Sequence, residues 1–419
     1  MSEFTRGEVM ATQSGTVATR LREARETAGL TQQQAADWLG IRRPGIAEIE
    51  SGKRGVRTEE LARLSSLYGR SLRYFAVGEL APEDKIAGAL FRAGEEDNHE
   101  LRRQAASLSR RCQLVSRAEE KLGLRRNATL APQYTNDRAI KDQTLAQIHG
   151  AQVAYQERSR LGMGARAPLR DPWGIVEASG VHVLSLELGQ DHAIDGIFTR
   201  AHDGATCVGI NVDKWIFRQV FTVVHEYGHA LMDTDLQSEI CATERAWKGG
   251  SQHLYANREL RANQFAAVFL VPKEALLWYF ESRGKLGRDR WGGVRALGVT
   301  ALEIVRAQDH FGVSADMLLW RLRNEDLITA AQRSAVKAEL HLAGSQNVAR
   351  SLGYDWRARA QPFTRAHEIA LDAYKRGYVS LGILAEIFGK DKEEMLDLLR
   401  EWNISQDFAD DDRLVGALS

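Results

Sequence analysis

Near the middle of the chain, residues 223–231 read VVHEYGHAL, with two histidines separated by three residues inside an apolar helical pattern. Residues four apart lie on one face of an α-helix, so His225 and His229 project side by side. Two imidazoles at this spacing can occupy adjacent corners of a tetrahedral zinc site. Glu226 follows the first histidine, where its carboxylate can take a proton from an attacking water without binding the metal. The segment therefore predicts a helix that carries a catalytic zinc site.

A third ligand is predicted in the next helical pattern, RELRANQFAAVFL at residues 258–270. Glu259 and Asn263 are four residues apart and share one face of that helix, while its phenylalanines supply core contacts. Two histidines and Glu259 would leave one position of the metal open, which is the arrangement of catalytic rather than structural zinc. Asn263 is predicted to hydrogen-bond the second ring nitrogen of a histidine ligand. The alternative is a chance HExxH segment on a buried helix, with both histidines satisfied in the core.

The composition is that of an ordinary soluble globular protein. Its 419 residues suffice for two to four domains, and 44% of them are hydrophobic and 27% charged. The net charge is zero, so any nucleic-acid site must be local. No apolar run approaches the ~20 residues that span a bilayer, and no signal-peptide pattern opens the chain. The three cysteines lack CxxC spacing, which argues against a disulfide framework and favours a reducing, cytoplasmic location.

A separate set of helical patterns lies between residues 15 and 79. One helix is predicted over residues 32–39 and ends at Gly40, and the next begins near Pro44. Two short helices joined through a glycine turn are typical of the helix-turn-helix motif, whose second helix enters the major groove of DNA. Residues 17–79 contain 11 Lys+Arg against 8 Asp+Glu, so this region is basic within a neutral chain.

The segment LREARETAGLTQQQAADWLGIRRPGIAEIESGKR, residues 21–54, closely resembles the XRE (Cro/cI-like) family of repressors. The resemblance implies contacts to DNA bases and phosphates. The residues that would make them are Gln32, Gln33, Arg42, Arg43, Gly45, Ala47, Glu48, Lys53 and Arg54. Pro44 and Gly45 depart from the small hydroxyl residues usual in the family, and Glu48 replaces a basic or polar residue. The alternative is a small helical bundle used for dimerisation or protein recognition.

The order of two strands, an HExxH helix and a second ligand helix resembles the ImmA/IrrE family of metallopeptidases, over about residues 170–275. FGVS at residues 311–314 also resembles that family. The resemblance implies zinc-dependent peptide hydrolysis, with Glu226 as the catalytic base. A donor for the oxyanion must come from elsewhere, and the candidates are His182, His253 and Tyr255.

These patterns together predict a mainly α-helical protein with a small β-sheet, of the α+β class. Four regions are expected: a helix-turn-helix bundle at 15–79, a helical connector at 80–165, a zincin-like peptidase domain at 166–285 and a helical C-terminal part at 286–419. Arginine pairs in the connector, among them Arg110-Arg111, predict a solvated helix face. Residues 380–396 have a helix-turn-helix-like pattern, for which packing on the peptidase domain is the alternative to a second DNA reader.

The function predicted is a DNA-binding transcriptional regulator with Zn2+-dependent endopeptidase activity. The family resemblance implies cleavage of a repressor or antitoxin-like protein in a stress, DNA-damage or mobile-element response. The expected partners are a double-stranded DNA operator, that protein substrate and a second copy of the chain, because helix-turn-helix proteins usually read two half-sites. Two alternatives stay open: a DNA-binding repressor whose zinc domain senses or scaffolds with little proteolysis, and a toxin–antitoxin component.

Overall fold

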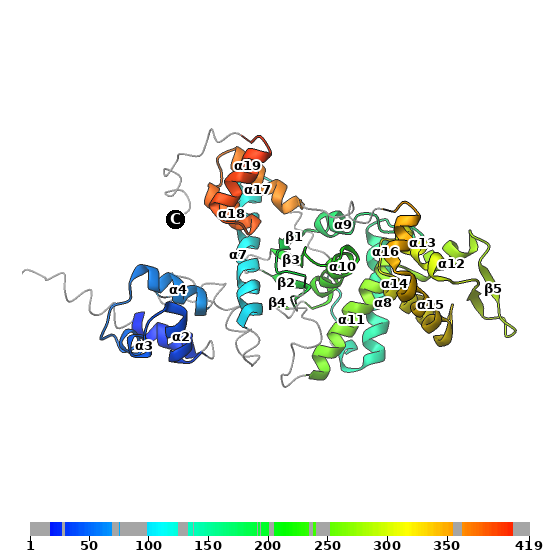
Figure 1. Ribbon diagram of the computed structural model, residues 1–419, viewed down its shortest axis with the longest axis horizontal. Coiled ribbons are helices and arrows are strands. Elements are labelled where there is room, and N and C mark those ends of the chain that lie inside the picture. Colours follow the sequence, from blue (N-terminus) through cyan, green and yellow to red (C-terminus); the bar gives the residue numbers. More distant parts are fainter. Residues whose placement is uncertain are drawn as a thin grey trace, which may run out of the picture.

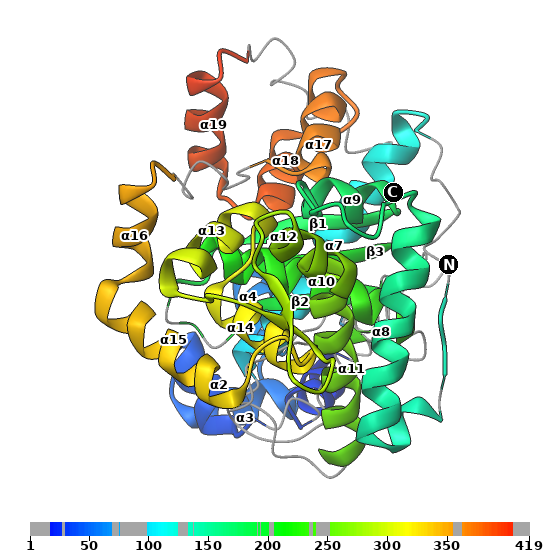
Figure 2. The ribbon, with the colours of Figure 1, turned by 90° about the vertical axis from the view of Figure 1, so that its right-hand side faces the viewer.

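The architecture is mainly helical with one small mixed sheet, as predicted (Figures 1 and 2). The computed structural model of the chain describes residues 17–26, 30–68, 75, 99–124, 133–136, 138–190, 192, 194–200, 205–233, 238–239, 252–354 and 363–404. Among these residues, no helix combines the length and the apolar character needed to cross a membrane.

The N-terminal helices pack around a core of their own. α2 (Gln32–Leu39) begins at Thr31, whose side chain accepts a hydrogen bond from the backbone of Gln34, and it ends at Gly40 with φ of 70°. α3 (Arg43–Glu50) has a proline in its first turn, and α4 (Thr58–Tyr68) closes the bundle. The core consists of apolar side chains from these helices and from residues 17–26: Leu21, Ala24, Ala35, Ala36, Leu39, Ile46, Ile49, Leu64 and Leu67.

A four-stranded sheet lies at the centre of the larger body. Its strands are β1 (Val181–Leu186), β2 (Gly196–Arg200), β3 (Thr206–Asn211) and β4 (Ser238–Glu239), in the order β1-β3-β2-β4. β1 and β3 run parallel, and β2 is antiparallel to both of its neighbours. Alternation along β1 sends Val183 to one core and Leu184 to the other. Both faces of the sheet are therefore buried, and every residue of β3 is buried along its length.

Helices from distant parts of the chain cover the two faces of the sheet. α10 (Ile216–Met232) and α9 (Pro172–Ala178) pack on one face, and α7 (His99–Lys121) and α17 (Arg365–Lys375) on the other. Figure 1 shows the sheet between α7 and α10. A Cβ atom on Gly209 of β3 would lie 2.9 Å from the Leu108 side chain of α7, so a glycine lets this helix approach the sheet.

The second helix of the predicted connector also packs on the body. α8 (Gln143–Arg160) follows a short turn, η2 (Ala139–Lys141), and lies along α11 (Gln252–Leu270). A Cβ on Gly150 would lie 2.2 Å from the carbonyl oxygen of Arg261, so the two backbones touch at this glycine. The buried Arg158 donates a 2.7 Å hydrogen bond to the carbonyl of Phe269 near the end of α11. α8 thereby supports the helix that carries Glu259.

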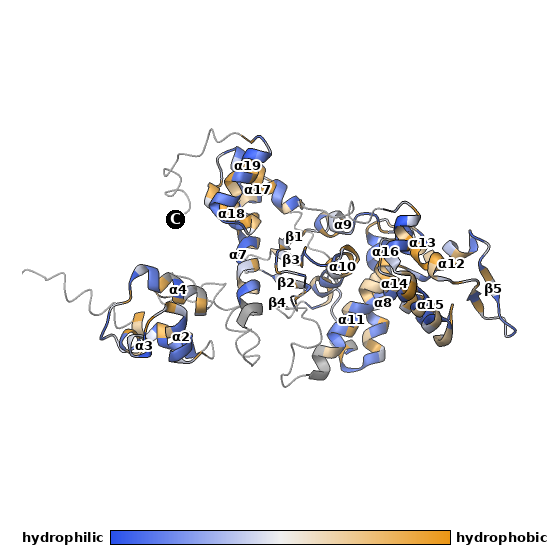
Figure 3. Ribbon diagram, viewed as in Figure 1, coloured by the Kyte–Doolittle hydropathy of each residue, from blue (hydrophilic) through white to orange (hydrophobic). Residues whose placement is uncertain are grey.

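The C-terminal helices divide between the two cores. α12 to α16 extend the core on the α10 side: α12 (Lys273–Glu281), α13 (Ala301–Phe311), α14 (Ala315–Asn324), α15 (Ala330–Ala343) and α16 (Ser345–Ser351). Along α11 and α15, hydrophilic and hydrophobic residues alternate in stripes (Figure 3). The C-terminal part, which was predicted to be helical, begins instead with a hairpin of β5 (Leu286–Arg288) and β6 (Val294–Ala296).

The last helices return to α7, where a buried arginine joins three elements. Arg111 of α7 donates hydrogen bonds to the carbonyl of Ile387, at 2.9 and 2.7 Å, and to the carbonyl of Ser185 on β1, at 3.0 Å. Ile387 belongs to α18 (Leu381–Phe388), and α19 (Lys392–Glu401) follows. The prediction of a solvated face is therefore wrong for Arg111, because the C-terminal helices cover it. It holds for Arg110, which is exposed and paired with Glu386.

Cys112 of α7 and Cys207 of β3 form a disulfide, with their Cα atoms 5.9 Å apart. Both cysteines are fully buried between the helix and the sheet. The prediction that no disulfide would form is wrong for this pair. Spacing along the chain gave no sign of it, because the two residues meet only after α7 packs on β3. The third cysteine, Cys241, lies outside the described residues.

His367 of α17 is a buried histidine that helps to cap its own helix. Its Nδ1 accepts a 3.3 Å hydrogen bond from the backbone N–H of Thr364, and its ring lies 4.4 Å from that of Phe388 between centroids. Burial, and in addition the positive charge of Arg111, lowers the pKa of His367 to about 3. Because the same group has a pKa of ~6.5 when unfolded, the stability it contributes is complete above that value and is lost as the pH falls toward 3.

Replacing this histidine should make the free energy of unfolding depend less steeply on pH under acidic conditions. In His367→Gln an acceptor for the Thr364 N–H remains while the titrating group is gone. Between pH 6.5 and 4 the free energy of unfolding should therefore fall less steeply than in wild type, by up to about 1.4 kcal/mol per pH unit. Urea unfolding over a pH series measures this slope. His341→Gln, at an exposed site on α15, is the control. Parallel profiles for wild type and His367→Gln would contradict the assignment.

Candidate metal centre and DNA-binding surface

The helix that carries the HExxH motif, α10, is buried on nearly all of its faces. Of the 17 residues of α10, all are buried except Arg218 and Phe221. Gly228 lies inside the motif, and a Cβ there would stand 2.8 Å from the ring of Phe265 on α11. A glycine at this position lets α11 pack closely enough to present its own polar side chain beside the two histidines.

Three ligand-type atoms from the two helices converge. The Nε2 atoms of His225 and His229 lie 3.0 Å apart. Glu259 places Oε2 3.3 Å from the first of these nitrogens and Oε1 3.2 Å from the second. These side chains are the one group of three or more His, Cys, Asp or Glu in the described part of the chain that could hold a metal ion.

The separations fit a tetrahedral zinc ion. Zinc ligands at 2.0–2.1 Å from the metal stand about 3.3 Å apart at the corners of a tetrahedron. Burial lowers the pKa of His225, so its ring is neutral and keeps a lone pair available for a metal. Burial alone would raise the pKa of Glu259, but the two adjacent histidines lower it well below its usual range. The site thus offers two imidazole nitrogens and one carboxylate.

A residue that the sequence patterns did not predict orients the second histidine. Asp233 follows the end of α10, is buried, and places Oδ2 2.8 Å from Nδ1 of His229. Its other oxygen accepts from Arg261 and from Arg258, the latter at 3.2 Å, both on α11 beside Glu259. One carboxylate therefore fixes a histidine and ties α10 to the helix of the third ligand. The i,i+4 spacing from His229 was the signal in the sequence.

Asn263 does not take the position predicted for it. It is exposed on α11, while His229 has Asp233 at its second ring nitrogen. The spacing correctly puts Asn263 one turn after Glu259. Which residues of α11 face the site depends on how the helix packs against its neighbours. In this packing, Asn263 faces solvent.

Glu226 is fully buried, and its side chain points toward the start of β2. A Cβ added to Gly196 would lie 3.2 Å from Oε1 of Glu226 and 2.4 Å from the methyl carbon of Thr222. A glycine is therefore required where the sheet meets the HExxH helix. Adjacent Asp195 is buried and paired with Arg218, one of the two residues of α10 that are not buried.

One oxyanion candidate is excluded by its place on the sheet. His182 lies on the β1 face that carries Leu184, away from α10, and its Nε2 is 3.3 Å from Glu119 of α7. It therefore cannot donate to a group bound near His225. The side chains of His253 and Tyr255 lie outside the described residues.

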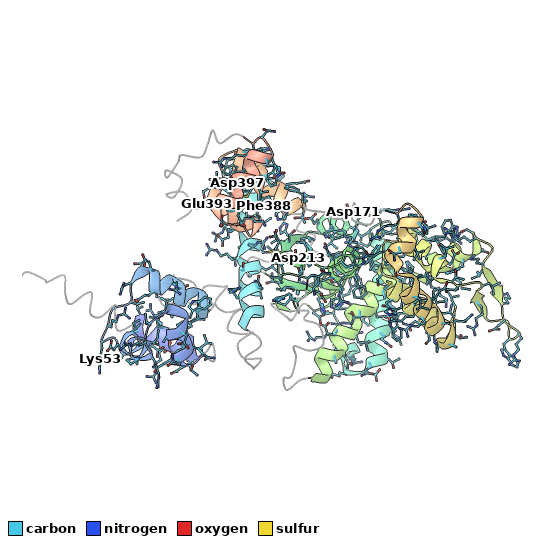
Figure 4. All side chains as sticks on the ribbon, viewed as in Figure 1. Lys53, Asp171, Asp213, Phe388, Glu393 and Asp397 are labelled. Atoms are coloured by element: carbon cyan, nitrogen blue, oxygen red, sulfur yellow. A yellow bond between two sulfur atoms is a disulfide. The ribbon has the colours of Figure 1, made fainter. Side chains whose placement is uncertain are left out.

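The predicted DNA contacts lie on one part of the N-terminal bundle. Five of them are exposed there: Gln33, Arg42, Arg43, Glu48 and Lys53. Lys53 lies at the outer edge of the bundle (Figure 4). Gly45 and Ala47 of α3 are half-buried.

The remaining two predicted contacts are held within the bundle. The amide of Gln32 donates a 3.0 Å hydrogen bond to Glu50, which also forms a buried ion pair with Arg25 at 2.5 Å. Arg54 is paired with Glu60 at 2.5 Å. Among the predicted contacts, the cations that face outward without a carboxylate partner in the described residues are therefore Arg42, Arg43 and Lys53.

Comparisons with known proteins agree with both parts of this structure. Residues 21–75 match the helix-turn-helix family model, which covers α2 to α4. Residues 176–323 match the model of the IrrE N-terminal-like domain of the M78 peptidases, which spans the sheet, the HExxH helix and α11 to α14.

A curated relative is the SPbeta prophage-derived uncharacterized HTH-type transcriptional regulator YonR of Bacillus subtilis (strain 168). It is 35% identical over 92 residues, which amount to 20% of this chain and 85% of that protein. The chain therefore belongs to the XRE-type helix-turn-helix transcriptional regulators, and it carries an IrrE N-terminal-like domain of the M78 peptidase family.

Proposed function

We propose that this regulator is also a zinc-dependent endopeptidase, with His225, His229 and Glu259 as the metal ligands. The observation that carries the proposal is the convergence of two histidine nitrogens, 3.0 Å apart, with the carboxylate of Glu259 from the next helix, whose oxygens lie 3.3 and 3.2 Å from them. Three protein ligands leave a fourth position for water or substrate, as in catalytic zinc sites. The buried Asp233 supports the same proposal, because zinc-bound histidines commonly donate their other nitrogen to a carboxylate.

A zinc ion bound here would polarise the scissile carbonyl and bring the pKa of a water molecule from 15.7 to about 7. The protein's own part is to orient, to exclude water and to move a proton. Glu226 is buried beside His225, where a carboxylate can accept the proton of the attacking water and pass it to the leaving amine. The surrounding apolar side chains of α10 and α11 keep the local dielectric low, which strengthens each of these interactions.

The substrate proposed is a repressor or antitoxin-like protein, cleaved in a stress, DNA-damage or mobile-element response. β4 pairs only with Phe198 and Thr199 of β2 among the described residues. The start of β2, next to Glu226, is thus a place where an extended peptide could add to the sheet and lie across the site. The helix-turn-helix domain would bring the peptidase to an operator, where a second copy of the chain reads the other half-site.

A second candidate function is regulation without turnover, in which the metal site senses or scaffolds. It agrees with the relative from Bacillus subtilis, which is an HTH-type transcriptional regulator. The two functions differ in one measurable respect, since a sensor needs the metal ligands but not Glu226.

Glu226→Gln should bind zinc as wild type does and lose proteolysis. The amide has the same shape but cannot accept the proton, and removal of a general base typically costs about 10²–10⁴-fold in rate. The measurement is zinc content of the purified protein together with cleavage of co-encoded repressor or antitoxin-like proteins. Glu401→Gln, at an exposed carboxylate of α19, is the control. Equal cleavage by both variants would contradict the role of Glu226, and zinc binding without cleavage by wild type would favour the sensor.

Asp233→Asn should weaken zinc binding while the ligands themselves stay unchanged. Loss of the charged partner of a histidine ligand typically costs about 10–100-fold in metal affinity. Competition with a chromophoric chelator measures the affinity, and near-ultraviolet circular dichroism checks that the variant is folded. Asp397→Asn, on the outer face of α19, is the matched control. A folded variant with wild-type affinity would show that Asp233 has no part in the metal site.

Arg42→Ala/Arg43→Ala should weaken DNA binding and reduce its dependence on salt. If both guanidiniums neutralise phosphates, the slope of log K against log salt concentration should become shallower by about 1.8, which is about 0.9 per contact. Fluorescence anisotropy with a duplex from the protein's own promoter region measures this slope. Arg376→Ala/Arg400→Ala removes the same charge from exposed positions on α17 and α19 and should leave the slope unchanged. An unaltered slope in the first variant would remove α3 from the DNA interface.

A further inference from the structure

The β5–β6 hairpin projects from the C-terminal part of the body (Figure 1). Residues 283–298 contain five Lys+Arg and one Asp, a net charge of +4 in a chain whose total is zero. At the tip, Trp291 is 81% exposed, which is far more than an indole normally shows in a folded protein. Packing within the molecule does not account for the exposed tryptophan or for the excess of basic residues on this hairpin.

The tip is an ordered turn. Asp289 accepts hydrogen bonds from the backbone N–H of Trp291 at 2.9 Å and of Gly293 at 2.8 Å, and a further backbone bond joins Asp289 N–H to the Gly293 carbonyl. Gly292 adopts φ of 79°, a conformation that favours glycine. The turn therefore holds Trp291 outward in a defined orientation, and the exposure of the ring is built into the hairpin.

Three of the five cations form ion pairs with carboxylates of the same chain. Arg283 and Lys285 lie 3.7 and 2.7 Å from Glu303, and Arg295 lies 3.0 Å from Asp289. These pairs fix the base of the hairpin to α13 and its two strands to each other.

The other two cations are at the tip and have no carboxylate partner in the described part of the chain. Arg288 donates only to the carbonyl of Gly292, at 3.0 Å, and Arg290 lies over the Trp291 ring at 4.9 Å from its centroid. Both are exposed. The tip thus presents two unbalanced guanidiniums around one indole, which is the combination that binds phosphates and stacks on bases or sugars.

We propose that the β5–β6 hairpin is a second DNA-contacting element of this regulator. Arg288 and Arg290 would bind phosphates on either side of a groove, and Trp291 would pack against the bases or sugars within it. A two-stranded ribbon is narrow enough to enter the major groove, which is about 12 Å wide. The site is separate from the N-terminal bundle and from the zinc ligands, so the chain would hold DNA at two places.

The structure favours this hairpin over the helix-turn-helix-like pattern near the C-terminus. Of the exposed residues of α19, four are acidic and two basic, and Figure 4 labels two of the acidic ones, Glu393 and Asp397. A helix with this charge repels phosphates. α18 packs on α7, and α19 packs on α18, with Leu384, Met395 and Leu399 in the shared core, which agrees with helical packing as the alternative to a second DNA reader.

The test uses the full chain and a fluorescent duplex of random sequence over a series of potassium chloride concentrations. Arg288→Ala/Arg290→Ala should bind more weakly, with a slope of log K against log salt shallower by about 1.8. Arg350→Ala/Arg376→Ala removes two exposed arginines, from α16 and from the C-terminal end of α17, and is the matched control. The same slope in both variants would overturn the proposal.

Trp291→Ala tests the packing of the ring separately from charge. It should weaken binding without changing the slope, because the ring would no longer pack against base edges or sugars in the groove. Trp320→Ala is its control, because Trp320 is 53% exposed and also lies beneath an arginine, Arg333, at 4.1 Å. Equal binding by the two tryptophan variants would overturn this part of the assignment.

Anionic phosphatidylserine vesicles serve as the competing partner, since arginine and tryptophan also suit membrane surfaces. If the hairpin variants lose vesicle binding but keep DNA binding, the DNA assignment is wrong. DNA binding is measured here without any proteolysis, so the outcome is independent of whether the chain is a peptidase.

Discussion

The carboxylate of Asp233 joins the two helices on which the metal site depends. It contacts His229 on one side and two arginines of α11 on the other, so the position of Glu259 is linked to the position of the second histidine. Burying a charge of this kind is costly unless it is fully paired, and here each oxygen has a cationic or N–H partner. The pairing fixes the register of α11 against α10. Gly228 allows the approach, and Phe265 fills the space that a side chain would have occupied.

The rest of the body holds that pair of helices in place. α8 lies along α11 and touches its backbone at Gly150. The sheet packs against α10 through Phe198, Val208 and Ile210. The opposite face of the sheet is closed by α7 and the C-terminal helices, with Arg111 and the Cys112–Cys207 disulfide at their junction. The helices of the predicted connector are therefore structural members of the body. A mutation in α7 or α17 can then affect the metal site through the sheet.

Charge is distributed locally in this neutral chain. In the N-terminal bundle, Arg25 and Glu50 neutralise each other in the interior, and Arg42, Arg43 and Lys53 face outward. In the β5–β6 hairpin, three cations are paired and two at the tip are not. In both places the ion pairs stabilise the local fold. The cations that have no carboxylate partner in the described residues are available to bind DNA. The exposed face of α19 is mainly acidic instead. In this helix-turn-helix-like segment, the charge of the exposed residues argues against DNA binding, although the helical pattern resembles that of a DNA reader.

The sequence by itself determined several of the helices and strands and identified the candidate metal ligands. Local signals were sufficient for α2, β1, β3 and α10, because caps, glycine ends and apolar periodicity act over a few residues. The HExxH spacing and Glu259 were also evident, since four-residue spacing on a helix fixes which side chains share a face. Only the tertiary structure decided which way each face turned. Asn263 faces solvent, Asp233 faces His229, His182 lies on the wrong side of the sheet, and two distant cysteines meet. These outcomes depend on packing between elements far apart in the chain, which no local pattern encodes.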